Sequence, residues 1–179
     1  MELYLVSRIT IMETKDRIKL LKEALALTKH PEGGYFKEVY RSVGEIPAET
    51  LSESFTGIRN YSTSIYYLLT SEAYSSFHKI KQDETWHFYE GGTIHLHMIS
   101  PEGTHQTITI GSRIEKGEVY QYTVPGNHWF AAEIEESDSY ALVGCTVAPG
   151  FDFDDFELGK RENLTQKYPQ HAALIRRFT

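Results

Sequence analysis

Residues with titratable side chains are concentrated in the stretch SSFHKIKQDETWHFYEGG, at residues 75–92. This stretch holds two histidines, three acidic residues and four aromatic residues. A histidine beside a carboxylate is suited to proton transfer, because the carboxylate stabilises the imidazolium form and raises the histidine pKa. His78 and Glu84 are therefore the candidate catalytic pair, and they predict general acid–base chemistry.

Aromatic and charged side chains from other segments are expected to complete a ligand pocket around this pair. Trp86, Phe88 and Phe130 would form an apolar stacking surface. Glu38 would add a second carboxylate, and Arg41 or Arg59 would bind an anionic group of the ligand. A hydroxyl would come from Tyr66 or from its neighbour Tyr67. The predicted ligand-binding residues are Glu38, Arg41, Arg59, Tyr66, Trp86, Phe88, His128 and Phe130.

The elements that must position these residues are predicted to be short β-strands. Turn signals such as Gly91-Gly92 and Pro125-Gly126-Asn127 divide the chain at intervals. Many short strands without intervening helices indicate a sandwich or a barrel. The predicted strands are 35–41, 59–69, 75–80, 84–90, 93–99, 105–110, 118–124, 128–134 and 140–147.

Alternation along the strand at 84–90 predicts which side chains face inward. Glu84, Trp86, Phe88 and Glu90 would share one face, and His87 would lie on the other unless a bulge intervenes. The acid–base hypothesis requires His78 and Glu84 to lie on the same face of their sheet.

Helices are predicted only near the two ends. Apolar residues at three- and four-residue spacing predict a helix at 14–28, with Thr14 as its N-cap and His30-Pro31 after its end. Residues 1–13 are a possible extension or added strand. From Glu162 onward two short helices are expected, the second with Pro169 in its first turn.

Two segments are assigned structural roles. His30 is expected to stabilise the turn before Gly33. In the segment PGFDFDDFEL, the aromatic side chains at 151, 153 and 156 are expected to pack across the barrel, and its aspartates are not expected to bind a metal.

Bulk composition excludes several classes of protein. With 179 residues, 40% hydrophobic content and 24% charge, the chain fits one globular domain. The net charge of −7 argues against a nucleic-acid partner. No run approaches ~18 apolar residues, so no membrane span is expected. Cys145 is the only cysteine, which excludes an intrachain disulfide and favours a reducing, cytoplasmic location.

Five segments, in order, carry a resemblance to a known family. They are HPEGGYFKEVYRS (30–42), STSIYYLL (62–69), FHKIKQDETWHFYEG (77–91), VPGNHWFAA (124–132) and ALVGCTVAPGFDFDDFEL (141–158). The chain resembles the cupin superfamily, within it a single-domain group that opens with HPEGGYF. The resemblance implies an all-β fold, a double-stranded β-helix or jelly-roll barrel, at 35–147 of a single domain spanning 1–179, with a C-terminal segment at 148–179. It also implies a homodimer and a ligand cavity in the mouth of the barrel.

The same resemblance bears on metal binding. Two cupin motifs together supply three histidines and a glutamate to a metal, and His78 and Glu84 occupy two of these places. Ile80 and Phe130 occupy the other two. Because catalytic divalent ions normally have about three protein ligands, the metal-free interpretation is favoured, with no cofactor. If a divalent metal were bound, its ligands would be His78 and Glu84 with His87 or His128.

These observations predict a small-molecule-binding protein. The favoured hypothesis is a metal-independent isomerase or epimerase that acts on a sugar-like or carbonyl ligand by acid–base chemistry. Two alternatives stay open: a non-catalytic ligand-binding module, and a metal-dependent cupin enzyme with non-standard ligands.

Overall fold

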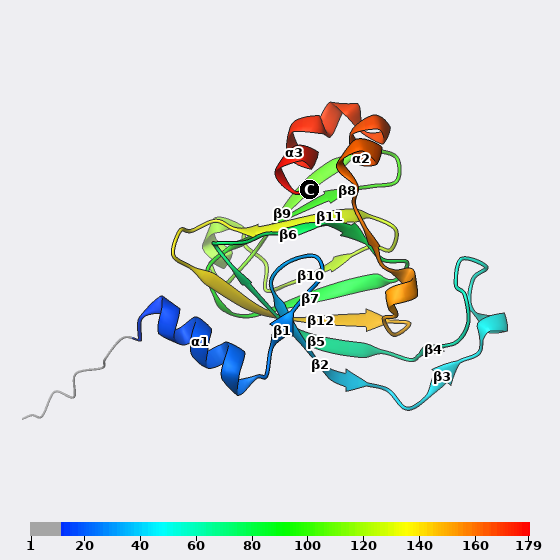
Figure 1. Ribbon diagram of the computed structural model, residues 1–179, viewed down its shortest axis with the longest axis horizontal. Coiled ribbons are helices and arrows are strands. Elements are labelled where there is room, and N and C mark those ends of the chain that lie inside the picture. The colour runs from blue at the N-terminus through cyan, green and yellow to red at the C-terminus, as the bar shows by residue number, and fades with distance from the viewer. Residues whose placement is uncertain (1–11) are drawn as a thin grey trace, which may run out of the picture.

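The computed structural model describes residues 12–179, so most of the predicted N-terminal extension lies outside the described residues. The described chain forms two antiparallel sheets that face each other, with helices near both ends (Figure 1). This arrangement confirms the predicted all-β architecture with terminal helices. None of the helices among residues 12–179 is long and apolar enough to cross a membrane.

One sheet has six strands and supplies most of the candidate site. Neighbouring strands in it are antiparallel throughout. In spatial order its strands are β1 (Thr28–Lys29), β2 (Tyr35–Arg41), β5 (Thr63–Thr70), β12 (Tyr140–Ala148), β7 (Asp83–Gly91) and β10 (Gln121–Val124).

The facing sheet has five strands. Its order is β13 (Glu157–Leu158), β6 (Ser75–Lys79), β11 (Trp129–Ile134), β8 (Ile94–Ile99) and β9 (His105–Ile110). A separate two-stranded ribbon pairs β3 (Glu45–Ile46) with β4 (Arg59–Asn60), so the predicted strand at 59–69 is divided between β4 and β5. The 3₁₀ turns are η1 (Ala48–Thr50), η2 (Ile114–Lys116), η3 (Phe153–Asp155) and η4 (Pro169–His171).

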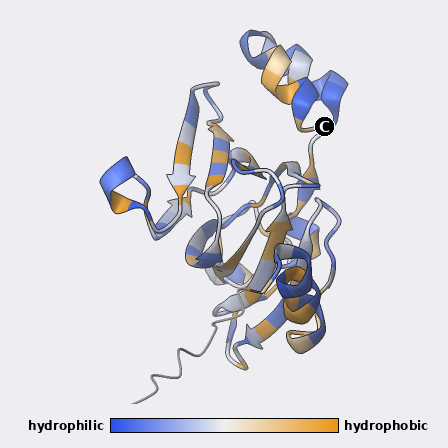
Figure 2. Cartoon of the chain, turned by 90° about the vertical axis from the view of Figure 1, so that its left-hand side faces the viewer, coloured by the Kyte–Doolittle hydropathy of each residue, from blue (hydrophilic) through white to orange (hydrophobic). Residues whose placement is uncertain are grey.

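The main core lies between the two sheets. Tyr67, Leu69 and Trp86 from the six-stranded sheet pack against Leu96 and Phe130 from the five-stranded sheet, and all five side chains are buried. The alternation of hydrophobic and hydrophilic residues along the strands, visible in Figure 2, produces this inward apolar face. Burial of each such side chain stabilises the fold by roughly 1.5–3 kcal/mol.

Helices cover the outer face of each sheet. Helix α1 (Thr14–Ala24) packs Leu21 against Leu68 and Leu142 on the six-stranded sheet. Helices α2 (Arg161–Lys167) and α3 (Ala172–Arg177) place Leu164 and Ile175 on the five-stranded sheet (Figure 1). The two short C-terminal helices were predicted, and Pro169 lies in the turn η4 that leads into α3.

The first helix ends earlier than its apolar spacing predicts. It ends at Ala24 rather than at residue 28, because Ala26 adopts a left-handed conformation with φ 50°. Thr28 then pairs with Phe36 in the sheet. The prediction that Thr14 is the N-cap is wrong. Thr14 is the first helical residue, Glu13 is the N-cap, and no side chain caps the N-terminus of the helix.

The alternation predicted for β7 holds from Glu84 to Phe88 and then changes. Glu84 and Trp86 are buried, whereas His87 contacts Gln121 and Thr146 on the outer face. A β-bulge shifts the pairing of β7 with β12. Glu90 was predicted on the inner face, but beyond the bulge it binds Arg17 of α1 on the outer face instead.

Candidate functional site

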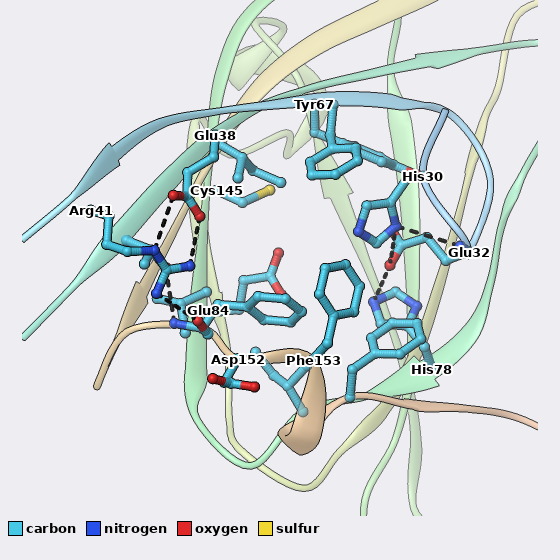
Figure 3. A pocket seen from close by; sticks show the side chains of 17 residues that line it. His30, Glu32, Glu38, Arg41, Tyr67, His78, Glu84, Cys145, Asp152 and Phe153 are labelled. Atoms are coloured by element: carbon cyan, nitrogen blue, oxygen red, sulfur yellow. Dashed lines mark hydrogen bonds and ion pairs between the residues drawn. The ribbon is translucent and has the colours of Figure 1, made fainter. Parts of the chain in front are cut away.

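A cavity of about 240 Å³ opens between the two sheets and is the candidate site (Figure 3). Strands β2, β5, β6, β7 and β12 supply its wall, together with the turn before β2 and the segment before β13. Its lining residues are His30, Glu32, Phe36, Glu38, Arg41, Thr63, Ile65, Tyr67, His78, Ile80, Glu84, Cys145, Val147, Phe151, Asp152, Phe153 and Phe156.

The centre of the cavity's polar wall is the buried carboxylate of Glu32, which links two histidines. Its Oε2 lies 2.9 Å from Nε2 of His78 and 3.3 Å from Nδ1 of His30. Its Oε1 accepts a hydrogen bond of 2.9 Å from the hydroxyl of Ser75. Three neighbours therefore hold one carboxylate in a single orientation.

A sharp turn aims this carboxylate inward. Gly33 and Gly34 follow Glu32 with φ values of 117° and 67°, which other residues rarely adopt. A Cβ atom on Gly33 would lie only 2.2 Å from the carbonyl oxygen of Tyr74. The two glycines of HPEGGYF thus let the turn approach β6 closely enough for Glu32 to reach His78.

Both ring nitrogens of His78 face acceptor atoms. Nδ1 lies 2.8 Å from the backbone carbonyl oxygen of Ser76, and Nε2 faces the Glu32 carboxylate. A carbonyl oxygen can only accept, so Nδ1 must carry a proton. With Glu32 ionised, Nε2 must carry one as well, and the ring is then an imidazolium ion.

Electrostatics support this assignment. Burial lowers the pKa of His78, but the charge of Glu32 and the hydrogen bond to it outweigh burial, so the pKa is raised. Burial alone would raise the pKa of Glu32, whereas His78 and His30 together hold that pKa far below its usual range. The two residues form a buried ion pair.

Glu84 differs from Glu32 because no cation pairs with it in the described part of the chain. Its side chain is buried on β7 and lines the cavity. Burial, reinforced by the negative charge of Glu32, raises the pKa of Glu84. Burial beside Glu84 also raises the pKa of the Cys145 thiol well above its usual value. Glu84 is therefore a cavity carboxyl group whose pKa is shifted toward the protonated form.

A second ion pair lies across the cavity from the His30–Glu32–His78 group (Figure 3). Arg41 donates to both carboxylate oxygens of Glu38, at 3.0 and 2.7 Å. These side chains are 38% and 40% exposed, which places the pair at the mouth of the cavity.

The segment between β12 and β13 forms an aromatic wall. Phe151, Phe153 and Phe156 all line the cavity, and the ring of Phe153 stacks on that of His30 at 6.3 Å between centroids. They were predicted only to pack across the barrel. Asp155 anchors this wall, because Arg59 donates two hydrogen bonds of 2.7 Å to its buried carboxylate.

The structure brings together four of the predicted site residues: His78, Glu84, Glu38 and Arg41 line one cavity. The predicted direct pairing of His78 with Glu84 is wrong, however. The expectation that one sheet carries both residues is wrong as well, because they lie in different sheets that share this cavity. The carboxylate that binds His78 is Glu32.

The other predicted ligand-binding residues do not line this cavity. Arg59 binds Asp155 behind the wall, and Tyr66 packs against Tyr89 on the outer face while Tyr67 lines the cavity. The remaining four also lie elsewhere: Trp86 and Phe130 in the core between the sheets, Phe88 packed against that core, and His128 with Nδ1 3.2 Å from the Gly126 carbonyl oxygen.

Sequence reasoning missed Glu32 and gave His30 only a structural role. Both belong to HPEGGYF, where the glycine pair signalled a turn. An acidic residue directly before two glycines was the available signal, because such a turn can direct a side chain into the interior.

The residues present do not fit a cupin metal centre. Among residues 12–179, no group of three or more His, Cys, Asp or Glu side chains is arranged to hold a metal ion. Ile80 lines the cavity where a ligand would be required, and both nitrogens of His78 are engaged. The alternative ligands do not converge either, since His87 lies on the outer face and His128 is outside the cavity.

Comparisons with known proteins agree with this architecture. Residues 19–159 match the family described as Cupin superfamily (DUF985). The uncharacterised protein YML079W of Saccharomyces cerevisiae is 33% identical over 165 residues, covering 87% of this chain and 82% of the yeast protein.

Two solved structures are similar over most of their length. A hypothetical protein from Leishmania major has a TM-score of 0.82 at 35% identity, covering 90% of this chain and 97% of that one. Protein SO0799 from Shewanella oneidensis has a TM-score of 0.80 at 37% identity, covering 94% and 98%. None of these descriptions names a reaction or a ligand.

Proposed function

The chain belongs to the DUF985 family of the cupin superfamily, and on that premise we propose that it is a metal-independent isomerase or epimerase. Its ligand is a small carbonyl or sugar-like compound bound in the cavity. The observation that carries this proposal is Glu84, a buried carboxyl group without a cationic partner among the described residues, in a cavity that also contains His30.

The proposed step is a proton transfer between neighbouring carbon atoms. The ionised form of Glu84 takes the proton from the carbon next to a carbonyl group, and the C–H electron pair forms the double bond of an enediol. The carbonyl oxygen takes a proton from Nε2 of His30. Glu84 then returns its proton to the former carbonyl carbon, while His30 recovers one from the other hydroxyl. No oxidant or reductant is consumed.

His78 and Glu32 act through His30 in this scheme. Glu32 contacts His30 Nδ1 and so orients the ring, which leaves Nε2 for the ligand. The imidazolium of His78 balances the charge of Glu32 in the protein interior. They are positioning residues, whereas Glu84 and His30 contact the ligand.

A non-catalytic binding module is the second candidate function. The observation in its favour is that His78, the histidine at the family's motif position, has both ring nitrogens occupied by protein acceptors. Such a histidine orders the cavity but has no free nitrogen for the ligand.

Deuterium exchange separates the two functions. The protein is incubated in D₂O with free aldoses and ketoses, and NMR follows deuterium entering the carbon next to the carbonyl group. Catalysis predicts exchange that Glu84→Gln abolishes and that Glu90→Gln, on the same strand but its outer face, retains. Binding without exchange in the wild type favours the module and contradicts the enzyme.

Assembly and location stay predictions. A homodimer is expected from the family resemblance, and sedimentation velocity tests it. A reducing, cytoplasmic location is expected because Cys145, the single cysteine of the chain, cannot form an intrachain disulfide.

A further inference from the structure

We propose that the ligand of this cavity is an uncharged polyhydroxy compound of about one ring, and that its phosphorylated and carboxylated analogues are excluded. This inference rests on the proposed function, whose substrate class it narrows. The sequence alone pointed the other way, since it predicted that Arg41 or Arg59 binds an anionic group of the ligand.

Arg41 is the one arginine among residues 12–179 that lines the cavity, and protein acceptors already bind most of its N–H groups. Arg41 uses Nε and Nη2 for Glu38, and Nη1 donates to Asn60 Oδ1 at 2.9 Å and to the carbonyl oxygen of Phe151 at 3.1 Å. Four of its five N–H groups therefore have protein acceptors. A phosphate or carboxylate would have to displace Glu38 to gain the paired donors that such groups require.

The other basic side chains in or near the cavity also have carboxylate partners. Arg59 binds Asp155 through two hydrogen bonds, and Lys81 Nζ lies 2.9 Å from the same carboxylate. The two histidines that line the cavity, His78 and His30, both contact the carboxylate of Glu32. Within residues 12–179, the cavity therefore presents no unpaired cation to an anionic ligand.

Two carboxyl groups remain without a cationic partner among the described residues. Glu84 lies inside the cavity and Asp152 lies in its aromatic wall. An added phosphate would meet the negative charge of Asp152, and that of Glu84 whenever it is ionised. It would also lose its hydration without compensation, which disfavours binding. The charge balance of the cavity is therefore neutral to negative, and it selects against anions.

The cavity also suits a neutral ligand better than a cation. Burial and the charge of Glu32 raise the pKa of Glu84, and the protonated form that this shift favours can donate and accept hydrogen bonds to hydroxyl groups. Phe153 and His30 offer stacked rings, and Phe36 and Phe156 add apolar surface. A volume of about 240 Å³ is below the ~300 Å³ lower limit of drug-sized pockets, as expected for a single ring.

Calorimetric titration of matched compounds tests the inference. The probes are glucose and fructose, their 6-phosphates, glucuronate and glucosamine. We expect a neutral sugar to bind, and its phosphate ester to bind at least about tenfold more weakly. Equal or tighter binding of a phosphate ester or of glucuronate overturns the inference while leaving the proposed function intact. Tighter binding of glucosamine than of glucose overturns it as well.

A variant that should gain affinity for the phosphate ester provides a second test of the inference. Glu38→Ala frees two sides of the Arg41 guanidinium, so affinity for the phosphate ester should rise at least about tenfold. Glu115→Ala changes net charge equally at an exposed turn and should leave that affinity unchanged. Equal gains in both variants contradict the role of Arg41. Failure of every probe to bind the wild type contradicts the proposed function itself, and the substrate class with it.

Discussion

Nε2 of His78 lies 2.9 Å from Oε2 of Glu32, and both side chains are buried where the HPEGGYF turn meets β6. The turn and the strand are distant in sequence, so this contact joins the first strand region to the opposite sheet. It organises the polar wall of the cavity, because Glu32 also contacts His30 and Ser75.

Removal of this carboxylate should weaken both the fold and the charge on His78. Glu32→Gln is expected to cost about 3 kcal/mol in free energy of unfolding, the lower end for breaking a buried pair, because the amide still forms a hydrogen bond. The His78 pKa, raised in the wild type, should fall. Urea denaturation and NMR titration of the imidazole measure the two effects.

The exposed pair supplies the control for this change. Glu38→Gln breaks the Arg41 pair at the cavity mouth and should cost no more than about 1 kcal/mol. Equal losses in the two variants would show that the Glu32–His78 pair is no more stabilising than a surface pair.

The pH dependence of this pair has a definite sign. The lowered pKa of Glu32 means that its contribution is present above about pH 4.3, the unfolded value, and is lost as pH falls toward the folded pKa. The raised pKa of His78 means that its contribution is lost as pH rises through the folded value. Stability measured by urea denaturation should therefore decline on both sides of a middle range, and more steeply in the wild type than in Glu32→Gln.

Replacement of Glu84, unlike that of Glu32, should remove activity without lowering the free energy of unfolding at pH 8. Because its folded pKa is raised, the wild type loses stability as pH rises through that value. Glu84→Gln removes this titration, so the variant should be at least as stable as the wild type at pH 8 and should lose proton exchange. Thermal unfolding at pH 5 and pH 8 tests it. A variant that is less stable at pH 8 would mean that ionised Glu84 stabilises the fold.

The aromatic wall should depend on Asp155. Asp155→Asn leaves Arg59 without its carboxylate in a buried position, and a loss of about 3–5 kcal/mol is expected. Backbone amides of residues 151–156 should exchange with D₂O faster than in the wild type. Asp154→Asn changes an exposed neighbour and should alter neither measurement.

Cys145 should be unreactive in the native protein. Its thiol is buried, and its pKa is raised well above the usual value, so little thiolate is present at pH 8. Labelling by a disulfide reagent should be complete in urea and far slower in buffer. Rapid labelling of the native protein would contradict the placement of Cys145 in the cavity wall.

Local patterns in the sequence account for most of the fold. Residues 35–41 and 105–110 form strands with the predicted bounds, because turn residues flank short segments of high β-propensity. The alternation of side chains along β7 correctly predicted that Glu84 faces inward and His87 outward. It failed at Glu90, where a bulge that depends on pairing with β12 changes the face.

The sequence by itself therefore determined most of the elements, most of their inward faces and the presence of His78, Glu84, Glu38 and Arg41 around one cavity. Only the tertiary structure decided which charge meets which: Glu32 rather than Glu84 binds His78, and Asp155 binds Arg59. Periodicity specifies the face on which a side chain lies, but an ion pair needs atoms within about 4 Å. That proximity arises only when two sheets and a distant turn close on one another.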